Sequence, residues 1–246
     1  TAMLRFMLEA LIFDVDGTLA DTEMAHLAAF NLAFAEMGLD WHWDVPLYTR
    51  LLEVSGGKER IHAYWKSRGD RSKEFDGGAV QATVDSLHEI KTAVYEQAVQ
   101  QGQVQMRPGA LQLMSAATAA GMRLAIATTT SPINIHSLLK RWMGEDWRTQ
   151  FSVIEDAATA PRKKPHPMVY SQTLQRLGLP AHACLAMEDS ANGLKAACKA
   201  GLATVITTNA FTAHQDFDGA LRTQRSLEGI GLAQLREWHR ESLTQR

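Results

Sequence analysis

The chain has 246 residues, of which 46% are apolar and 21% are charged, a composition typical of a globular protein large enough for one domain with an insertion. Its formal net charge of −2 argues against a nucleic-acid-binding face and against a polybasic membrane anchor. No apolar run approaches the roughly 20 residues that span a membrane, and no signal-peptide pattern opens the sequence, so we expect a cytoplasmic protein.

The first predicted strand runs from residue 10 to residue 15 and leads into two acids and a glycine, Asp14, Asp16 and Gly17. Side chains two residues apart on a strand point to the same side, so we expect both carboxylates to reach into one cleft. Two acids this close repel each other unless a cation or a shared proton relieves them, and Mg²⁺ prefers such oxygen ligands. One acid then suits a nucleophile and the other an acid/base catalyst. Taken alone, the segment is equally typical of a strand that simply ends in a turn, with Asp and Gly as turn-forming residues.

Residues 22–101 contain only helical patterns. Apolar side chains recur with helical spacing over residues 22–37. Further helices are predicted over residues 46–52, 58–66 and 79–101. Residues 69–78 are polar and are expected to form a loop, whereas Trp41 and Trp43 are expected in the core of this helical block.

After residue 107, short apolar strands alternate with helices. The predicted strands are 123–128, 151–154, 183–187 and 203–206, and the predicted helices are 110–120, 132–142, 167–177 and 191–200. This alternation predicts an α/β fold, a Rossmann-like parallel sheet with helices on both faces and an inserted all-helical cap. We expect a catalytic core over residues 1–21 and 102–246, and a cap that acts as a specificity lid over residues 22–101. Ligands of such sheets lie beyond the carboxyl ends of the strands.

The two cysteines, Cys184 and Cys198, both fall in apolar segments. Their separation matches neither a metal-ligand motif nor a disulfide framework, which fits a reducing cytosol. We expect each of them to be a small buried apolar side chain.

The second predicted strand ends in a run of hydroxyl side chains, Thr128 to Ser131. Hydroxyls and free backbone N–H groups ahead of a helix can cradle an anion. Thr128 is the candidate for a phosphate contact, and Thr129 beside it is a candidate for substrate binding. Ser131, just before Pro132, fits the alternative role of a helix N-cap.

A basic loop, Arg162 to Pro167, follows the third predicted strand. If Asp14 is a nucleophile that attacks a phosphoryl group, a cation is needed to neutralise charge on the phosphoryl oxygens and on the acid. Lys164 is the candidate, because the adjacent Pro165 stiffens the loop that holds it. Without that context, a basic loop is more typical of a solvated surface.

Two further acids, Glu188 and Asp189, stand where the fourth predicted strand leads into a helix. Asp189 would complete a metal site with Asp14 and the backbone carbonyl of Asp16. Glu188 is expected at the rim, where it would hold a metal-bound water or Lys164. The alternative is that Asp189 and Ser190 merely cap the helix.

These four segments, in this order, resemble the motifs of the haloacid dehalogenase superfamily of phosphotransferases. The first motif matches residues 14–19, the second Thr128, the third Lys164 and the fourth Glu188–Asp189. The resemblance implies that Asp14 forms an aspartyl-phosphate, and that Asp16 protonates the leaving group and then activates water. It also implies a Mg²⁺ cofactor.

Within that superfamily the chain resembles the CbbY family of autotrophic bacteria and plastids, most specifically in residues 56–61, Gly-Gly-Lys-Glu-Arg-Ile. The resemblance implies a bacterial cytoplasmic phosphatase that removes the 1-phosphate of xylulose 1,5-bisphosphate, an inhibitor of Rubisco. A bisphosphate needs a second set of cations, and Lys58 and Arg60 can supply them, while Gly57 permits close backbone approach. The other candidate substrate contacts are Glu23, which would accept bonds from sugar hydroxyls, Tyr48 and His26. Packing under the cap is an equal alternative for His26.

Three other functions remain open on the sequence. A sugar-phosphate mutase of the β-phosphoglucomutase type would share the same core, and so would a phosphoglycolate phosphatase. A non-catalytic sugar-phosphate-binding protein is disfavoured because both Asp14 and Asp16 are present. We expect a small-molecule sugar phosphate as the partner, with no nucleic acid and no membrane. The sequence does not fix the oligomeric state, and a monomer is the working expectation.

Overall fold

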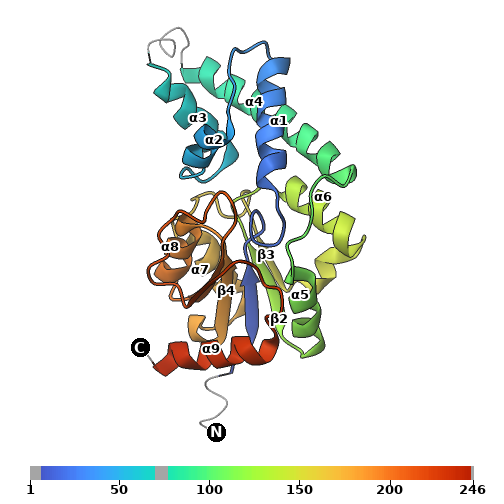
Figure 1. The fold of residues 1–246 in the computed structure, drawn as a ribbon, viewed down its shortest axis with the longest axis vertical. Helices are drawn as coiled ribbons and strands as arrows, with labels where there is room; N and C mark the ends of the chain where they lie inside the picture. The colour runs from blue at the N-terminus through green and yellow to red at the C-terminus, as the bar shows by residue number, and fades with distance from the viewer. Residues whose placement is uncertain (1–6, 70–76, 245–246) are drawn as a thin grey trace.

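The computed structural model describes residues 7–69 and 77–244 of the chain. Most of the expected loop over residues 69–78 therefore lies outside the described residues. Figure 1 shows a helical block at one end of the long axis and a sheet flanked by helices at the other. Within the described residues, no helix is long and apolar enough to cross a membrane.

One parallel sheet of six strands, in the order β3-β2-β1-β4-β5-β6, forms the centre of the larger part. The strands are β1 (Ala10–Phe13), β2 (Arg123–Ala127), β3 (Val153–Glu155), β4 (Cys184–Glu188), β5 (Ala203–Thr207) and β6 (Arg222–Gln224). Each strand is parallel to its neighbours, so all carboxyl ends lie at one edge. β1 lies between β2 and β4 in the middle of the sheet, which places the residues that follow it at the centre of that edge.

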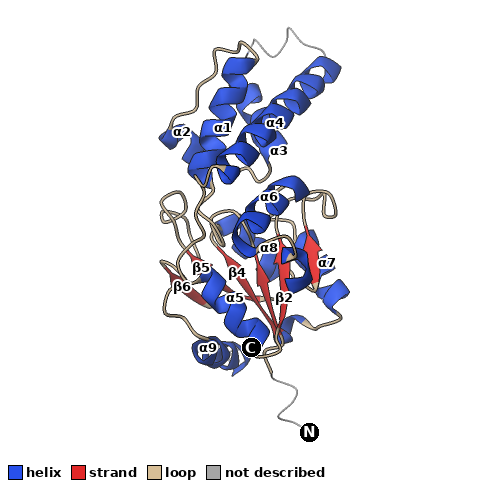
Figure 2. Cartoon of the chain, turned by 90° about the vertical axis from the view of Figure 1, so that its right-hand side faces the viewer, coloured by secondary structure: helices blue, strands red, loops and turns tan. Residues whose placement is uncertain are grey.

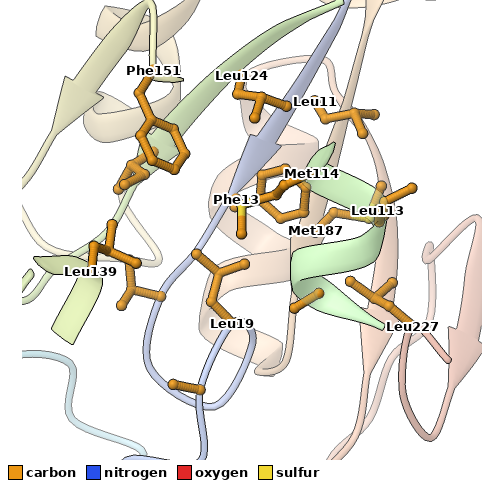
Figure 3. Packing of buried hydrophobic residues seen from close by; sticks show 14 of the residues in the cluster. Leu11, Phe13, Leu19, Leu113, Met114, Leu124, Leu139, Phe151, Met187 and Leu227 are labelled. Carbon is orange, nitrogen blue, oxygen red and sulfur yellow. The ribbon is translucent and has the colours of Figure 1, made fainter. Parts of the chain in front are cut away.

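Helices cover both faces of the sheet (Figure 2). They are α5 (Ala110–Ala119), α6 (Pro132–Met143), α7 (Met168–Leu177), α8 (Ala191–Lys199) and α9 (Leu232–Thr244). Leu11 and Phe13 of β1 pack in a cluster with side chains of α5, α6 and α9. Figure 3 shows part of this cluster, with Leu113 and Met114 of α5 and Leu139 of α6. Ala10 and Ile12, which point the other way, pack with α7 and α8. This double coverage explains why β1 is apolar and buried at all four positions, and it confirms the predicted α/β fold.

The helical block is inserted between β1 and α5. It consists of α1 (Glu23–Glu36), α2 (Val45–Leu51), α3 (Gly57–Ser67) and α4 (Gly77–Gln100). Trp41 and Trp43 are buried in its core, as expected, and Trp43 lies 4.8 Å from Phe30 between ring centroids. We call the rings at its centre the aromatic cluster, which comprises Phe30, Phe34, Trp41, Trp43, Tyr48, Tyr64 and Trp65. Full burial of each phenylalanine side chain in it contributes about 1.5–3 kcal/mol to the stability of the fold.

Two linkers, which run side by side, join the block to the sheet. Ala20 of the first forms a β-bridge with Met106 of the second. The buried Arg107 guanidinium donates to the carbonyl of Gly17 at 2.5 Å and to that of Thr207 at 2.9 Å. These bonds fix the turn after β1 against the end of β5.

Three features differ from the sequence-based expectations. Neither β6 nor α9 is predicted, because β6 has no apolar run and only Leu235, Trp238 and His239 of α9 are buried. Cys184 is buried as expected, but Cys198 is exposed, so the expectation of a buried side chain is wrong there. Cys198 follows the buried Ala196 and Ala197 on α8, and the turn of the helix carries it to the outer side.

Candidate active site

The predicted catalytic side chains meet at the carboxyl ends of three adjacent strands. Asp14 directly follows β1, Thr128 follows β2, and Glu188 and Asp189 stand at the end of β4. Asp14, Thr128 and Asp189 line one cavity of about 480 Å³. Residues from opposite ends of the sequence meet here because β1 pairs with both β2 and β4.

Lys164 reaches this edge from the loop between β3 and α7, and its side chain is buried. Its Nζ atom donates to Asp14 Oδ1 at 2.8 Å, Glu188 Oε1 at 2.6 Å and the Ala127 carbonyl at 3.0 Å. Burial by itself would lower the pKa of Lys164, but the two carboxylates outweigh it and raise that pKa above its ordinary value. Lys164 therefore carries a permanent positive charge beside Asp14.

Glu188 is fully engaged by hydrogen-bond donors. Its Oε1 atom also accepts from the Tyr170 hydroxyl at 2.5 Å, and its Oε2 atom accepts from the Asp189 amide at 3.2 Å. A carboxylate with both oxygens bonded is held in one orientation. Glu188 therefore orients Lys164, as the sequence predicts. Its expected place at the rim is wrong, because Glu188 is buried and does not line the cavity.

Asp14, Glu188 and Asp189 form a buried acidic cluster, with one carboxylate oxygen from each within 4.8 Å of the others. Burial raises the pKa of Asp14 to about 7, against the opposing charge of Lys164. Burial, together with the charges of Asp14 and Glu188, also raises the pKa of Asp189 well above its ordinary value. Three carboxylates and one lysine leave two negative charges unbalanced when all are ionised. A divalent cation with a preference for oxygen ligands fits this deficit.

Asp16 lies in a different environment from the acidic cluster. Its Oδ1 atom hydrogen bonds with His26 Nε2 at 2.8 Å, and the His26 ring stacks on Tyr95 with centroids 4.1 Å apart. Burial would raise the pKa of Asp16, but His26 and Lys91 outweigh it and lower that pKa to about 2. The Asp16 side chain is thus ionised and held beside the helical block. Its predicted metal contact, through the backbone carbonyl, stays a prediction.

The hydroxyl run after β2 divides into two roles. Thr128 and Thr129 both line the cavity. Ser131 also lines the cavity, but its hydroxyl caps α6, where it accepts from the Asn134 amide at 3.4 Å. The two readings of this segment therefore apply to different residues, with Thr128 and Thr129 available to an anion.

The helical block supplies the opposite wall of the cavity. Lys58 Nζ donates to Asp85 at 2.5 Å, in an ion pair whose side chains are both about half exposed. Arg60 donates instead to the carbonyls of Leu51 and Val54, both at 3.1 Å, and so organises the loop between α2 and α3. The predicted substrate-binding residues that line this wall are Glu23, His26, Gly57, Lys58 and Arg60.

Tyr48 does not line the cavity, although the sequence offers it as a substrate contact. Its buried hydroxyl donates to Glu23 Oε2 at 2.7 Å. The structure therefore places Tyr48 behind Glu23, where it orients that carboxylate toward the cavity.

Sequence reasoning missed two basic residues of α4, His88 and Lys91, which both line the cavity. Lys91 is buried, with its Nζ atom 5.0 Å from the centre of the Phe30 ring, and burial lowers its pKa to about 8. Burial likewise lowers the pKa of His88 to about 4. Their spacing of three residues on one helix was the available signal, since it puts both on one face.

The chain is similar to known proteins along nearly its whole length. The family model described as haloacid dehalogenase-like hydrolase matches residues 8–201. The plasmid-encoded Protein CbbY of Cupriavidus necator is 50% identical over 252 residues, covering 96% of this chain and 98% of that protein. CbbY from Rhodobacter sphaeroides has been crystallised with phosphate and, as a mutant, with xylulose-(1,5)bisphosphate. Both structures are 40% identical to this chain with a TM-score of 0.84, and cover 93% of this chain and 99% of the other.

Proposed function

Because the chain belongs to the CbbY family of haloacid dehalogenase-like hydrolases, and is thus a phosphoric monoester hydrolase, we propose that it is a Mg²⁺-dependent sugar bisphosphate phosphatase. Its proposed reaction is hydrolysis of the 1-phosphate of xylulose 1,5-bisphosphate, which removes a Rubisco inhibitor. One observation carries the proposal: a single cavity has Asp14, Asp189 and Lys164 on the sheet side and the cations Lys58 and Arg60 on the other. The relative bound to xylulose-(1,5)bisphosphate supports the choice of sugar.

The proposed reaction has two steps that share one acid/base catalyst. In the first, a carboxylate oxygen of Asp14 bonds to phosphorus, the bond from phosphorus to the sugar oxygen breaks, and that oxygen takes a proton from Asp16. In the second, Asp16 takes a proton from water, whose oxygen bonds to phosphorus as the bond to Asp14 breaks. The products are the sugar monophosphate and inorganic phosphate. Arrival of the phosphate's negative charge raises the pKa of Asp16, which favours its protonated form in the first step.

The residues around Asp14 prepare it for this attack. Lys164 donates to Asp14 Oδ1 at 2.8 Å, and the Thr18 hydroxyl donates to Oδ2 at 3.1 Å, so the carboxylate plane is fixed. Lys164 also places a positive charge where negative charge builds up on the transferring phosphoryl group. Thr128 and Thr129 offer hydroxyls to the same group from the end of β2.

Asp14 and Asp189 are the carboxylates best placed to hold Mg²⁺, with the backbone carbonyl of Asp16. Glu188 belongs to the same acidic cluster, but both of its oxygens already accept hydrogen bonds. When bound, Mg²⁺ would offset the negative charge of Asp14 and of the phosphate and so let the two approach.

Residues 22–101 are proposed to act as the specificity lid. Lys58 would exchange its exposed partner Asp85 for the second phosphate, because such surface pairs contribute only about 0–1 kcal/mol. Glu23, oriented by Tyr48, would accept bonds from the sugar hydroxyls, and Gly57 would admit the substrate close to the backbone.

A phosphate-release screen over sugar mono- and bisphosphates, with Mg²⁺ present, tests this function. We expect the highest kcat/KM on xylulose 1,5-bisphosphate, its loss in Asp14→Asn, and a raised KM for the bisphosphate in Lys58→Ala. Lys66→Ala, an exposed lysine on the same helix, is the matched control. Equal kcat/KM on monophosphates would refute a second phosphate site, and unchanged hydrolysis in Asp14→Asn would refute the covalent mechanism.

A further inference from the structure

The loop that follows β5 contains a side chain that the proposed mechanism does not use. Asn209 Nδ2 donates to Asp189 Oδ2 at 2.8 Å and to the carbonyl of Gly17 at 3.4 Å. Its Oδ1 atom accepts from the Phe211 amide at 2.9 Å. With both ends of the amide bonded, the orientation of Asn209 is fixed, and its donor end faces the acidic cluster.

Gly17 lies against the same two side chains. A Cβ atom built on Gly17 would be 2.3 Å from Asp189 Oδ2 and 2.7 Å from Asn209 Nδ2. The turn after β1, the acid after β4 and the loop after β5 therefore meet without space between them. A displacement of Asn209 would therefore break its bond to the Asp189 carboxylate or its bond to the turn after β1.

The same loop reaches into the helical block two residues later. Phe211 is buried, and its ring meets the Tyr48 ring edge-on with centroids 5.9 Å apart. Among the described residues, the other buried members of the apolar cluster around it all come from residues 27–87. Phe211 is thus the side chain through which the loop after β5 is anchored in the aromatic cluster.

We infer that Asn209 is a positioning residue for Asp189, and that Phe211 couples it to the helical block. The hydrogen bond from Asn209 occupies Oδ2, so we expect Oδ1 of Asp189 to be the oxygen available to a cation. Outer partners that orient metal-binding carboxylates typically change metal affinity by about 10–100-fold when they are removed. This inference rests on the proposed function in one respect, namely that Asp189 holds Mg²⁺.

Calorimetric titration of the purified protein with Mg²⁺, without substrate, tests the inference. We expect Asn209→Ala to weaken Mg²⁺ binding by at least about 10-fold, and Phe211→Leu to weaken it by a smaller factor. His214→Ala, an exposed side chain in the same loop, is the matched control and should bind Mg²⁺ as the wild type does. Thermal unfolding of each variant shows whether it is folded. Leucine is chosen to replace Phe211 because it is also apolar, so that the helical block stays packed.

The double variant completes the test. If Phe211 acts through Asn209, adding Phe211→Leu to Asn209→Ala weakens binding no further, because the two effects are not additive. Unchanged Mg²⁺ affinity in folded Asn209→Ala overturns the positioning role, and additive effects, or no effect of Phe211→Leu, overturn the coupling. Absence of Mg²⁺ binding in the wild type would instead refute the proposed function.

Discussion

At the scale of single residues, the acidic cluster carries more negative charge, when all its carboxylates are ionised, than Lys164 offsets. Burial raises the pKa of Asp14 from its ordinary value of 3.8 to about 7, and it raises the pKa of Asp189 as well. Lys164 offsets only one of the charges. Protons and Mg²⁺ are therefore alternative ways to relieve the same repulsion, and they compete for the same oxygens.

This competition makes the stabilisation by Mg²⁺ depend on pH. The pKa of Asp14 is near its ordinary value of 3.8 in the unfolded chain and about 7 in the folded protein. The free-energy cost of ionising Asp14 in the folded protein is therefore absent below about pH 4 and reaches its full value above about pH 7. Metal-free protein should therefore lose stability as pH rises through this range, while the increase in Tm on adding Mg²⁺ grows. Differential scanning fluorimetry at pH 5.5 and pH 8 checks this. A Tm increase that is the same at both pH values contradicts it, and Asp189→Asn should reduce the increase at pH 8.

Gly17 is the second residue whose chemistry is narrowly constrained. Its φ of +76° favours glycine, and a Cβ atom there would overlap Asp189 and Asn209. We expect Gly17→Ala to lower kcat by about 100-fold or more, since a shift of about 1 Å in a catalytic group has effects of that size. Gly38→Ala is the matched control, because Gly38 has a φ of +69° but nothing within 4 Å of its Cβ position. Similar kcat values for the two variants would contradict a role for the overlap with Asp189 and Asn209.

At the scale of elements, β1 to β5 follow the sequence-based prediction to within two residues at each boundary. Their strongly apolar segments predict them well, because a central parallel strand is buried on both faces. β6 escapes prediction because Arg222, Thr223 and Gln224 lie at the edge of the sheet and need no apolar side chains. An edge strand of this kind lacks the alternating apolar pattern from which strands are predicted.

The loop between α2 and α3 is held from two sides. Arg60 bonds its carbonyls from within the block, and Asn192 of α8 bonds it from the sheet side, with Nδ2 2.7 Å from the Glu53 carbonyl and 3.2 Å from Ser55 Oγ. These bonds join the helical block to α8 next to Ser55 and Ser190, which both line the cavity, and we expect them to hold the cavity closed there.

Loss of the Asn192 bonds should loosen this closure. We expect Asn192→Ala to raise KM for the bisphosphate by about 3–10-fold, the equivalent of one net hydrogen bond, with a smaller change in kcat. Steady-state kinetics of this variant and of Lys195→Ala, an exposed lysine on the same helix, provide the measurement. An unchanged KM in Asn192→Ala contradicts a role for these bonds in closing the cavity.

At the scale of the whole molecule, the sequence predicts the sheet side of the cavity more fully than the wall that the helical block supplies. Asp14, Thr128, Lys164 and Asp189 are found because each follows a predicted strand, and parallel strands must end at one edge. Lys91, His88 and Asn209 are missed because helix packing and a loop crossing bring them to the site. No local sequence pattern specifies where such elements meet in space. The hydrogen-bond partners of Lys58 and Arg60 could not be predicted for the same reason.

The central claim, that Asp14 and Asp16 transfer the 1-phosphate of a sugar bisphosphate to water, can be tested by following xylulose 1,5-bisphosphate with ³¹P NMR in the presence of Mg²⁺. We predict that the signal of the phosphate on C1 disappears, that the signal on C5 is retained as xylulose 5-phosphate, and that one equivalent of inorganic phosphate appears. Transfer of a phosphoryl group to another sugar position without inorganic phosphate, or loss of the C5 signal first, would contradict the account.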